Sequence, residues 1–182
     1  MREAIYNIDG ERLRKLIFKY FISNGNISMR DICRGTGLSL GSLYYWFDDK
    51  QNLVTEVTKY GFYKTVDKIF EYVFASVCDL DGFFGGILDY IDGFKNAIRF
   101  IYQIAANPEY SEKMREIALE VNYMYERLAL KLAHKTGSTP DKLRPCAYAI
   151  ASAVLDYVMW GDRQRAQCQL DFVYGIIKNL DN

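Results

Sequence analysis

Apolar residues recur three and four positions apart along most of the chain, the spacing that places them on one face of an α-helix. In the first such stretch, residues 10–23, Leu13, Ile17 and Phe21 share a face. No stretch gives a convincing β-strand pattern, so we expect an all-α protein. The expected helices span about residues 10–23, 29–35, 40–46, 48–78, 83–105, 109–135, 140–160 and 163–180.

Capping residues and glycines set the expected ends of these helices. Ser28 begins a sequence that resembles a capping box, and Ser39 is placed to cap the helix that follows it. Asp48 is expected to start the long central helix. Gly93 leaves open whether residues 83–105 form one helix or two.

The composition narrows the class of protein. Half of the 182 residues are hydrophobic and 15% are aromatic, which excludes a disordered chain. The 23 Lys and Arg residues are balanced by 23 Asp and Glu, which excludes a protein that coats nucleic acid through charge alone. The N-terminus has no apolar signal segment, and no stretch reaches the roughly 20 apolar residues of a membrane span. We expect a cytoplasmic protein without a membrane partner.

Few residues offer the chemistry of a metal site or a hydrolytic enzyme. His134 is the one histidine, and its expected place is the C-terminal end of a helix, where a cation is favoured. The four cysteines form no C-x-x-C pair, so we expect reduced, buried side chains, with a redox sensor as the alternative. These cysteines are Cys33, Cys78, Cys146 and Cys168. We expect no metal, no cofactor and no enzymatic activity.

Residues 28–47 hold two short expected helices separated by a turn at 36–39. This spacing is typical of a helix-turn-helix, in which Gly37 would permit the tight turn and an apolar residue would hold the helices together. The second helix of that motif enters the major groove of DNA, and small residues at its start, Gly41 and Ser42, allow close approach. The alternative is a pair of short helices without this role, which many helical proteins contain.

Residues 10–60 resemble the DNA-binding domain of the TetR (tetracycline repressor) family of bacterial transcriptional regulators. The most specific match is Gly-Leu-Ser-x-Gly-Ser-Leu-Tyr-x-x-Phe-x-x-Lys-x-x-Leu, at residues 37–53. Further matching residues are Phe21, Gly25, Met29, Arg30, Asp31 and Ile32. The resemblance implies an N-terminal three-helix helix-turn-helix domain at residues 1–50. It also implies a larger helical effector-binding and dimerisation domain at residues 51–182.

Two departures from the family pattern are visible. The loop at residues 25–28 is about two residues shorter than usual, and Leu16 and Ile17 stand where small residues are common. Both departures concern how the first helix packs and where it ends, and neither lies in the expected recognition helix.

The resemblance also implies roles in binding double-stranded DNA. Four residues would contact phosphates, which fixes register without reading sequence: Ser28, Ser39, Tyr44 and Lys50. Five residues would contact bases: Arg30, Leu40, Gly41, Ser42 and Tyr45. Among these, Arg30 would bind guanine in bidentate fashion, and Leu40 and Tyr45 would meet thymine methyl groups.

Other residues of this segment have structural expectations. Leu43 and Phe47 are expected in the core, and Tyr44 is expected to pack partly inside. For Trp46 the sequence leaves two interpretations open, a plug in the core or a contact with the DNA backbone.

One helix-turn-helix offers few phosphate contacts, so specific binding calls for a homodimer on a palindromic operator. The resemblance implies that the last two helices form the dimer contact, through two stripes of mostly small and branched residues at helical spacing. The alternative is that these stripes complete the core of one chain. The stripes are Ala147, Ala151, Val154 and Val158 in one helix, and Phe172, Val173, Ile176, Ile177 and Leu180 in the other.

Together these features imply a ligand-responsive regulator, expected as a repressor that leaves its operator when a small molecule binds. Many aromatic residues and few charges within 51–182 favour an apolar or aromatic effector, whose pocket residues we do not assign. One alternative is a DNA-binding protein of this fold without such an effector, controlled by a protein partner or acting architecturally. Another is a helical enzyme or carrier.

Charge is divided unevenly along the chain. Residues 1–47 carry seven Lys and Arg against four Asp and Glu, so the expected DNA-binding part is modestly basic. Non-specific binding would be weak at this charge, and affinity would depend on dimerisation and specific contacts.

Overall fold

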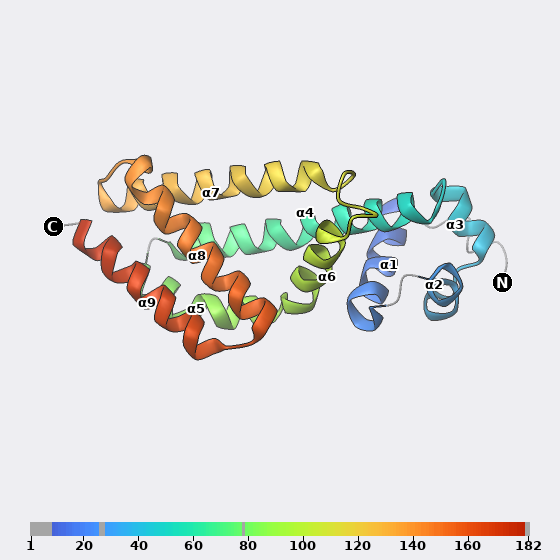
Figure 1. Ribbon diagram of the computed structural model, residues 1–182, viewed down its shortest axis with the longest axis horizontal. Helices are drawn as coiled ribbons and strands as arrows, with labels where there is room; N and C mark the ends of the chain where they lie inside the picture. Colours follow the sequence, from blue (N-terminus) through green and yellow to red (C-terminus); the bar gives the residue numbers. More distant parts are fainter. Residues whose placement is uncertain (1–8, 26–27, 78, 181–182) are drawn as a thin grey trace. The chain divides into compact units, whose positions relative to one another are not determined.

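The computed structural model describes residues 9–25, 28–77 and 79–180, and this part of the chain is all-α (Figure 1). Within those ranges there are nine helices and no strand, which confirms the expected fold class. The helices are α1 (Gly10–Asn24), α2 (Met29–Thr36), α3 (Leu40–Trp46), α4 (Lys50–Ser76), α5 (Leu80–Asp92), α6 (Lys95–Ala106), α7 (Arg115–Thr136), α8 (Pro140–Trp160) and α9 (Arg163–Leu180).

Side chains just before the helices cap several of them. Asp9 Oδ1 accepts hydrogen bonds from the amides of Glu11 and Arg12, at 2.6 and 3.2 Å. Ser39 Oγ accepts from the Ser42 amide at 3.0 Å, as expected from the sequence. Ser28 differs from expectation, because its side chain makes no capping bond to α2.

The start of the long helix α4 also differs from the expectation that Asp48 would begin it. Asp49 Oδ1 accepts a hydrogen bond from the Asn52 amide at 2.6 Å. The residue that caps the first turn of α4 is therefore Asp49, one position after the expected Asp48. The Asp48 amide instead donates to the Asn52 side chain, at 3.4 Å. Lys50 is therefore the first residue of α4.

Two expected helices have different limits. The stretch expected at 83–105 is two helices, because the chain turns after Asp92 and the Phe94 amide donates to the Ile91 carbonyl at 2.8 Å. The helix expected from residue 109 begins later, at Arg115. Residues 107–114 form consecutive turns instead, and the Asn107 side chain accepts a hydrogen bond from the Glu109 amide at 2.9 Å.

The chain divides into two compact units, with the boundaries inside α4, α6 and α7. The first unit combines the described residues up to Thr65 with Asn96–Ile117, and the second combines Val66–Lys95 with the described residues from Ala118 onward. These two units are defined by which residues pack together. The sequence analysis instead expected a boundary at residue 50 between a DNA-binding domain and an effector-binding domain, and that functional boundary stays a prediction.

The core of the first unit is built from one apolar face of each of its helices. Phe21 and Phe100, from α1 and α6, stack with ring centroids 5.1 Å apart. Ile17, one of the departures noted in the sequence, is fully buried here, whereas Leu16 lies at the surface. The larger buried side chains of the unit include Leu13, Ile32, Leu43, Phe47, Leu53, Val57 and Tyr110.

Glycine lets helices approach closely at two points in the first unit. A methyl group on Gly35 of α2 would overlap the ring of Tyr20 from α1, and one on Gly61 of α4 would overlap the ring of Phe18. The rings of Tyr20 and Phe18, both from α1, therefore occupy the space that a side chain at either glycine would need. The expected shortening of the loop between α1 and α2 concerns residues 26 and 27, which lie outside the described residues.

The second unit contains an antiparallel pair, α8 and α9, joined at Gly161, whose φ of 79° is the left-handed conformation that glycine favours. A polar cluster ties this pair to α5. Tyr157 donates a hydrogen bond to Asp92 at 2.7 Å, and the Lys95 ammonium lies 3.2 Å from the same carboxylate. The hydrogen bond from Tyr157, with the neighbouring cations, lowers the pKa of Asp92.

In the part of the chain that the structure describes, no helix is long and apolar enough to cross a membrane.

We predict that Gly35→Ala is less stable than Gly41→Ala by about 1–3 kcal/mol, because both changes favour the helix equally and only the first overpacks the contact with Tyr20. Gly41→Ala is the matched control. A methyl group there meets only Ser39 Oγ, at 3.9 Å, so this change should leave the free energy of unfolding equal or raise it by up to about 1 kcal/mol. Urea unfolding of both variants tests the difference. Equal stabilities would contradict the close packing, and Tyr20→Ala should reduce the cost of Gly35→Ala.

Candidate nucleic-acid interface

The turn between α2 and α3 is held by local hydrogen bonds. Gly37 has a φ of 73°, and its amide donates to the Cys33 carbonyl at 3.0 Å, which ends α2. The Thr36 hydroxyl donates to the Ile32 carbonyl at 2.6 Å and accepts from the Leu38 amide at 3.4 Å. The two helices are therefore separated by three residues of defined conformation.

One side of α3 is anchored in the first unit. Leu43 is fully buried and Phe47, which follows the helix, is 2% exposed. The turn contributes Leu38, which is also buried, and α2 contributes Ile32. The Arg14 guanidinium lies over the ring of Phe47, 5.7 Å from its centroid. These placements confirm the expectation that Leu43 and Phe47 are core residues, and they fix which side of α3 faces outward.

The other side of α3 presents large side chains to solvent. The exposed fractions are 45% for Leu40, 54% for Tyr44 and 72% for Tyr45. Gly41 is exposed between them, and Ser42 is half-buried. The core does not cover this apolar and aromatic surface of α3. We therefore interpret the outer face of the helix as a candidate contact surface.

Trp46 takes an intermediate position. Its side chain is 37% exposed, and its ring lies so close to Gly10 that a methyl group there would come within 3.0 Å. The ring also meets that of Tyr45 edge to face, with centroids 5.7 Å apart. Trp46 therefore packs over the start of α1. Of the two interpretations that the sequence left open, the one that places Trp46 as a plug in the core is wrong.

Two cationic residues of α2 and α4 form no ion pair among the described residues. Arg30 in the first turn of α2 and Lys50 at the start of α4 are both exposed, and neither forms an ion pair within that part of the chain. Arg34, by contrast, pairs with Asp31 at 3.2 Å. Arg30 and Lys50 can therefore meet an anion without first breaking an ion pair with any described residue.

The two serines expected to contact phosphates have different surroundings. Ser39 Oγ accepts the capping hydrogen bond from the Ser42 amide and lies 2.8 Å from Ser42 Oγ. A phosphate bound by the Ser39 hydroxyl would therefore compete with these contacts within the protein. Ser28 is half-buried at the start of α2. The nine expected DNA-contacting residues all lie in the first unit. They are on α2 and α3, at the residue just before each of these helices, and at the first residue of α4.

The residues expected at the dimer contact fall into three groups by exposure. Ala147, Val158, Val173 and Ile177 are at most 4% exposed and belong to the core of the second unit, as the alternative interpretation of the stripes expected, while the dimer contact itself stays a prediction. They are buried because α8 and α9 pack against each other and against α5. Ala151 and Val154 are half-buried, while the exposed members of the stripes are Phe172, Ile176 and Leu180.

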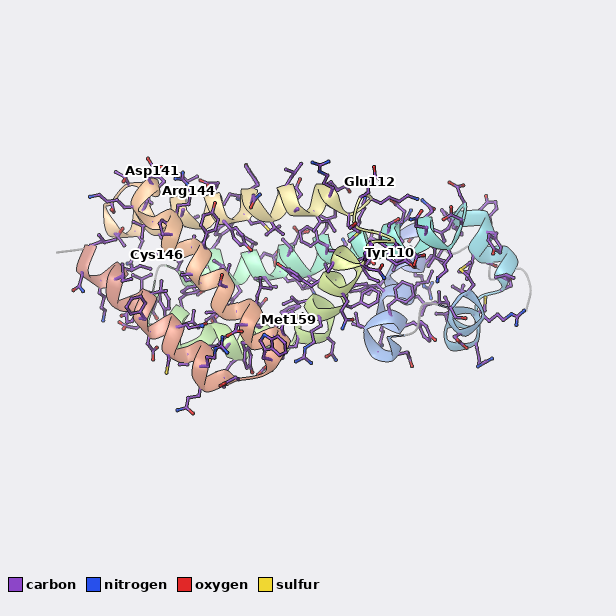
Figure 2. All side chains as sticks on the ribbon, in the orientation of Figure 1. Tyr110, Glu112, Asp141, Arg144, Cys146 and Met159 are labelled. Carbon is purple, nitrogen blue, oxygen red and sulfur yellow. The ribbon has the colours of Figure 1, made fainter. Side chains whose placement is uncertain are left out.

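Sequence reasoning missed exposed apolar residues on α8. Trp160 is 79% exposed, and Met159 and Tyr148 are each about two-fifths exposed. Figure 2 labels Met159 near the end of α8 and Cys146, which is buried, near its beginning. The spacing of 148 and 159, at three turns of helix, could have indicated this second face, but the more regular stripe at 147, 151, 154 and 158 obscured it.

The structure describes three of the four cysteines and the histidine. Burial raises the pKa of the thiols of Cys33 and Cys146, which keeps them protonated at neutral pH. Cys168 is exposed, and Cys78 lies outside the described residues. His134 is in the last turn of α7, as expected. No group of three or more potential metal ligands occurs among the residues that the structure describes.

No protein-family model, curated protein or solved structure matches the chain. The functional interpretation therefore depends on the geometry of α2, α3 and the start of α4, together with the sequence pattern of residues 37–53.

We predict that two identical substitutions in α3 have very different effects on stability. Leu43→Ala should lower the free energy of unfolding by about 2–5 kcal/mol, because it empties a fully buried site. Leu40→Ala should cost less than about 1 kcal/mol, because that side chain is already close to half exposed. Chemical unfolding followed by circular dichroism measures both. A large cost for Leu40→Ala would mean that this side chain serves the core and not a contact surface.

Proposed function

We propose that the protein is a DNA-binding transcriptional regulator in which α2 and α3 form a helix-turn-helix and α3 enters the major groove. The observation that carries the proposal is the division of α3 into an anchored side, with Leu43 fully buried, and an outer side with Leu40 and Tyr45 exposed. The major groove of B-DNA is about 12 Å wide, enough to admit one α-helix. The proposal agrees with the resemblance of residues 10–60 to the TetR family.

The proposed phosphate contacts surround this helix in the sequence. Lys50 would supply a point charge, the Tyr44 hydroxyl a hydrogen bond, and Ser28 and Ser39 further hydroxyls. Tyr44 supports this role through its exposure of more than half, where the sequence had suggested that it would pack partly inside. Gly41 supports close approach, because outside its own stretch of helix the nearest atom to the position of its missing side chain is Ser39 Oγ, at 3.9 Å.

The dimeric and ligand-responsive parts of the proposal depend on the family resemblance. A homodimer would present two copies of α3 to a palindromic operator, and the exposed residues Phe172, Ile176 and Leu180 offer apolar surface on α9 for that contact. We further propose that an apolar or aromatic small molecule bound among the helices after residue 50 releases the DNA, so that the protein acts as a repressor.

Selection from a random double-stranded DNA library tests the proposal most broadly. The full-length protein should enrich one inverted repeat, because two symmetric α3 helices read two half-sites about one helical turn, or a small multiple of one turn, apart. A chain carrying both Tyr44→Phe and Lys50→Ala should bind the selected duplex more weakly. Failure to enrich any sequence at low salt, with the protein folded, would contradict the proposed function.

We predict that two cationic residues affect the selected duplex differently. Lys50→Ala should weaken binding to all sequences alike and lower the slope of log K against log salt by about one, because one phosphate contact is lost. Arg30→Ala should change the preference at one base pair of each half-site, a discrimination of about 1–3 kcal/mol. Lys142→Ala, at an exposed position in α8, is the control and should change neither quantity. An unchanged base preference in the Arg30 variant would exclude Arg30 from base reading.

A further inference from the structure

The outer face of α3 lacks the side chains that read bases through paired hydrogen bonds. Specific contacts to guanine use Arg or Lys, those to adenine use Asn or Gln, and those to cytosine use Asp or Glu. The seven residues of α3 include none of these types. Its outward-facing side chains end in aliphatic carbon, aromatic rings and hydroxyl groups.

The hydroxyl groups give little discrimination between bases. A hydroxyl both donates and accepts, so it can bond to either kind of edge group. The Ser42 hydroxyl is in addition already within hydrogen-bond distance of Ser39 Oγ, at 2.8 Å. What remains for reading sequence is apolar contact, and the C5-methyl group of thymine is the apolar group on the major-groove edge of the bases.

The shape of the outer face suits a methyl group. Gly41 and Tyr45 are four residues apart, so they lie one turn apart on the same side of the helix, and Ser39 Oγ, at 3.9 Å, is the one side-chain atom found within 4 Å of the position that a Gly41 side chain would take. Leu40, in the adjacent row with Tyr44, presents an aliphatic end of which 45% is exposed. Both positions offer apolar surface that water covers in the free protein.

Within the described helices α2 and α3, the side chains that can form a paired hydrogen bond with a base lie on α2. Of the two cationic residues in α2 and α3, Arg34 pairs with Asp31, whereas Arg30 forms no ion pair with the described residues. The family resemblance already implies that Leu40 and Tyr45 contact thymine methyl groups. Because α3 carries no side chain for paired hydrogen bonds, we propose further that these methyl contacts supply most of the base recognition by α3. Each half-site would then be rich in A·T pairs, with at most one guanine, read by Arg30. This inference rests on the proposed function and names the class of DNA sequence that the same surface takes.

Uracil in place of thymine tests the proposal, since uracil pairs identically and lacks only the methyl group. Duplexes of the selected operator are made with uracil at one thymine at a time, and binding is measured by fluorescence anisotropy. Burial of one methyl group is worth about 0.8 kcal/mol, so uracil at a contacted thymine should weaken binding roughly fourfold. Uracil outside the half-sites should have no effect.

Variants of α3 link the effect to named side chains. In Leu40→Ala and Tyr45→Ala, each of which changes an exposed residue, the preference for thymine over uracil at one position should fall to about one. Lys50→Ala should weaken the thymine and uracil duplexes by the same factor and keep the preference. Those two results together support the proposal.

The failures of the two ideas are distinguishable. If the protein selects an operator but binds its fully uracil-substituted form as tightly as the thymine form, the methyl-group proposal is overturned and the proposed function stands. If the preference for thymine persists in both Leu40→Ala and Tyr45→Ala, other side chains carry it, and the assignment to α3 is wrong. If no duplex is selected at all, the proposed function itself fails.

Discussion

The candidate interface depends on the burial of Leu43 and Phe47 on the inner side of α3. A helix of seven residues is not stable in water by itself, so its conformation comes from that apolar contact and from the Ser39 cap. Because Gly37 fixes the turn before it, the orientation of α3 is set by three local features together. As a consequence, Leu40 and Tyr45 are exposed on a helix that Leu43 and Phe47 anchor in the first unit.

The sequence predicted this region well because its signals are local. A glycine that ends α2, a serine that caps α3 and an apolar residue at each buried position all lie within residues 28–47, so no distant contact was needed to place them. The limits of α3 and α9 agree with the structure to the residue. The DNA-contacting roles are not tested by the fold, since they concern a partner outside the chain.

Expectations that needed knowledge of packing partners were less accurate. Helical spacing showed that Ala147 and Val158 share a face, but α8 and α9 are apolar on more than one side, and spacing alone did not show which side meets α5. These residues are buried within one chain, and the exposed face instead carries Met159 and Trp160. Similarly, the turns at 107–114 interrupt an apolar pattern that reads as continuous helix.

Hydrogen–deuterium exchange of the full chain, with and without its selected duplex, measures the central claim most directly. If α3 enters the major groove, amides of α2, α3 and the first turn of α4 should exchange more slowly in the complex, since DNA covers this part of the first unit. A mutated duplex of equal length is the control and should give little protection. Protection confined to α8 and α9, or none at concentrations where the duplex is bound, would contradict the account.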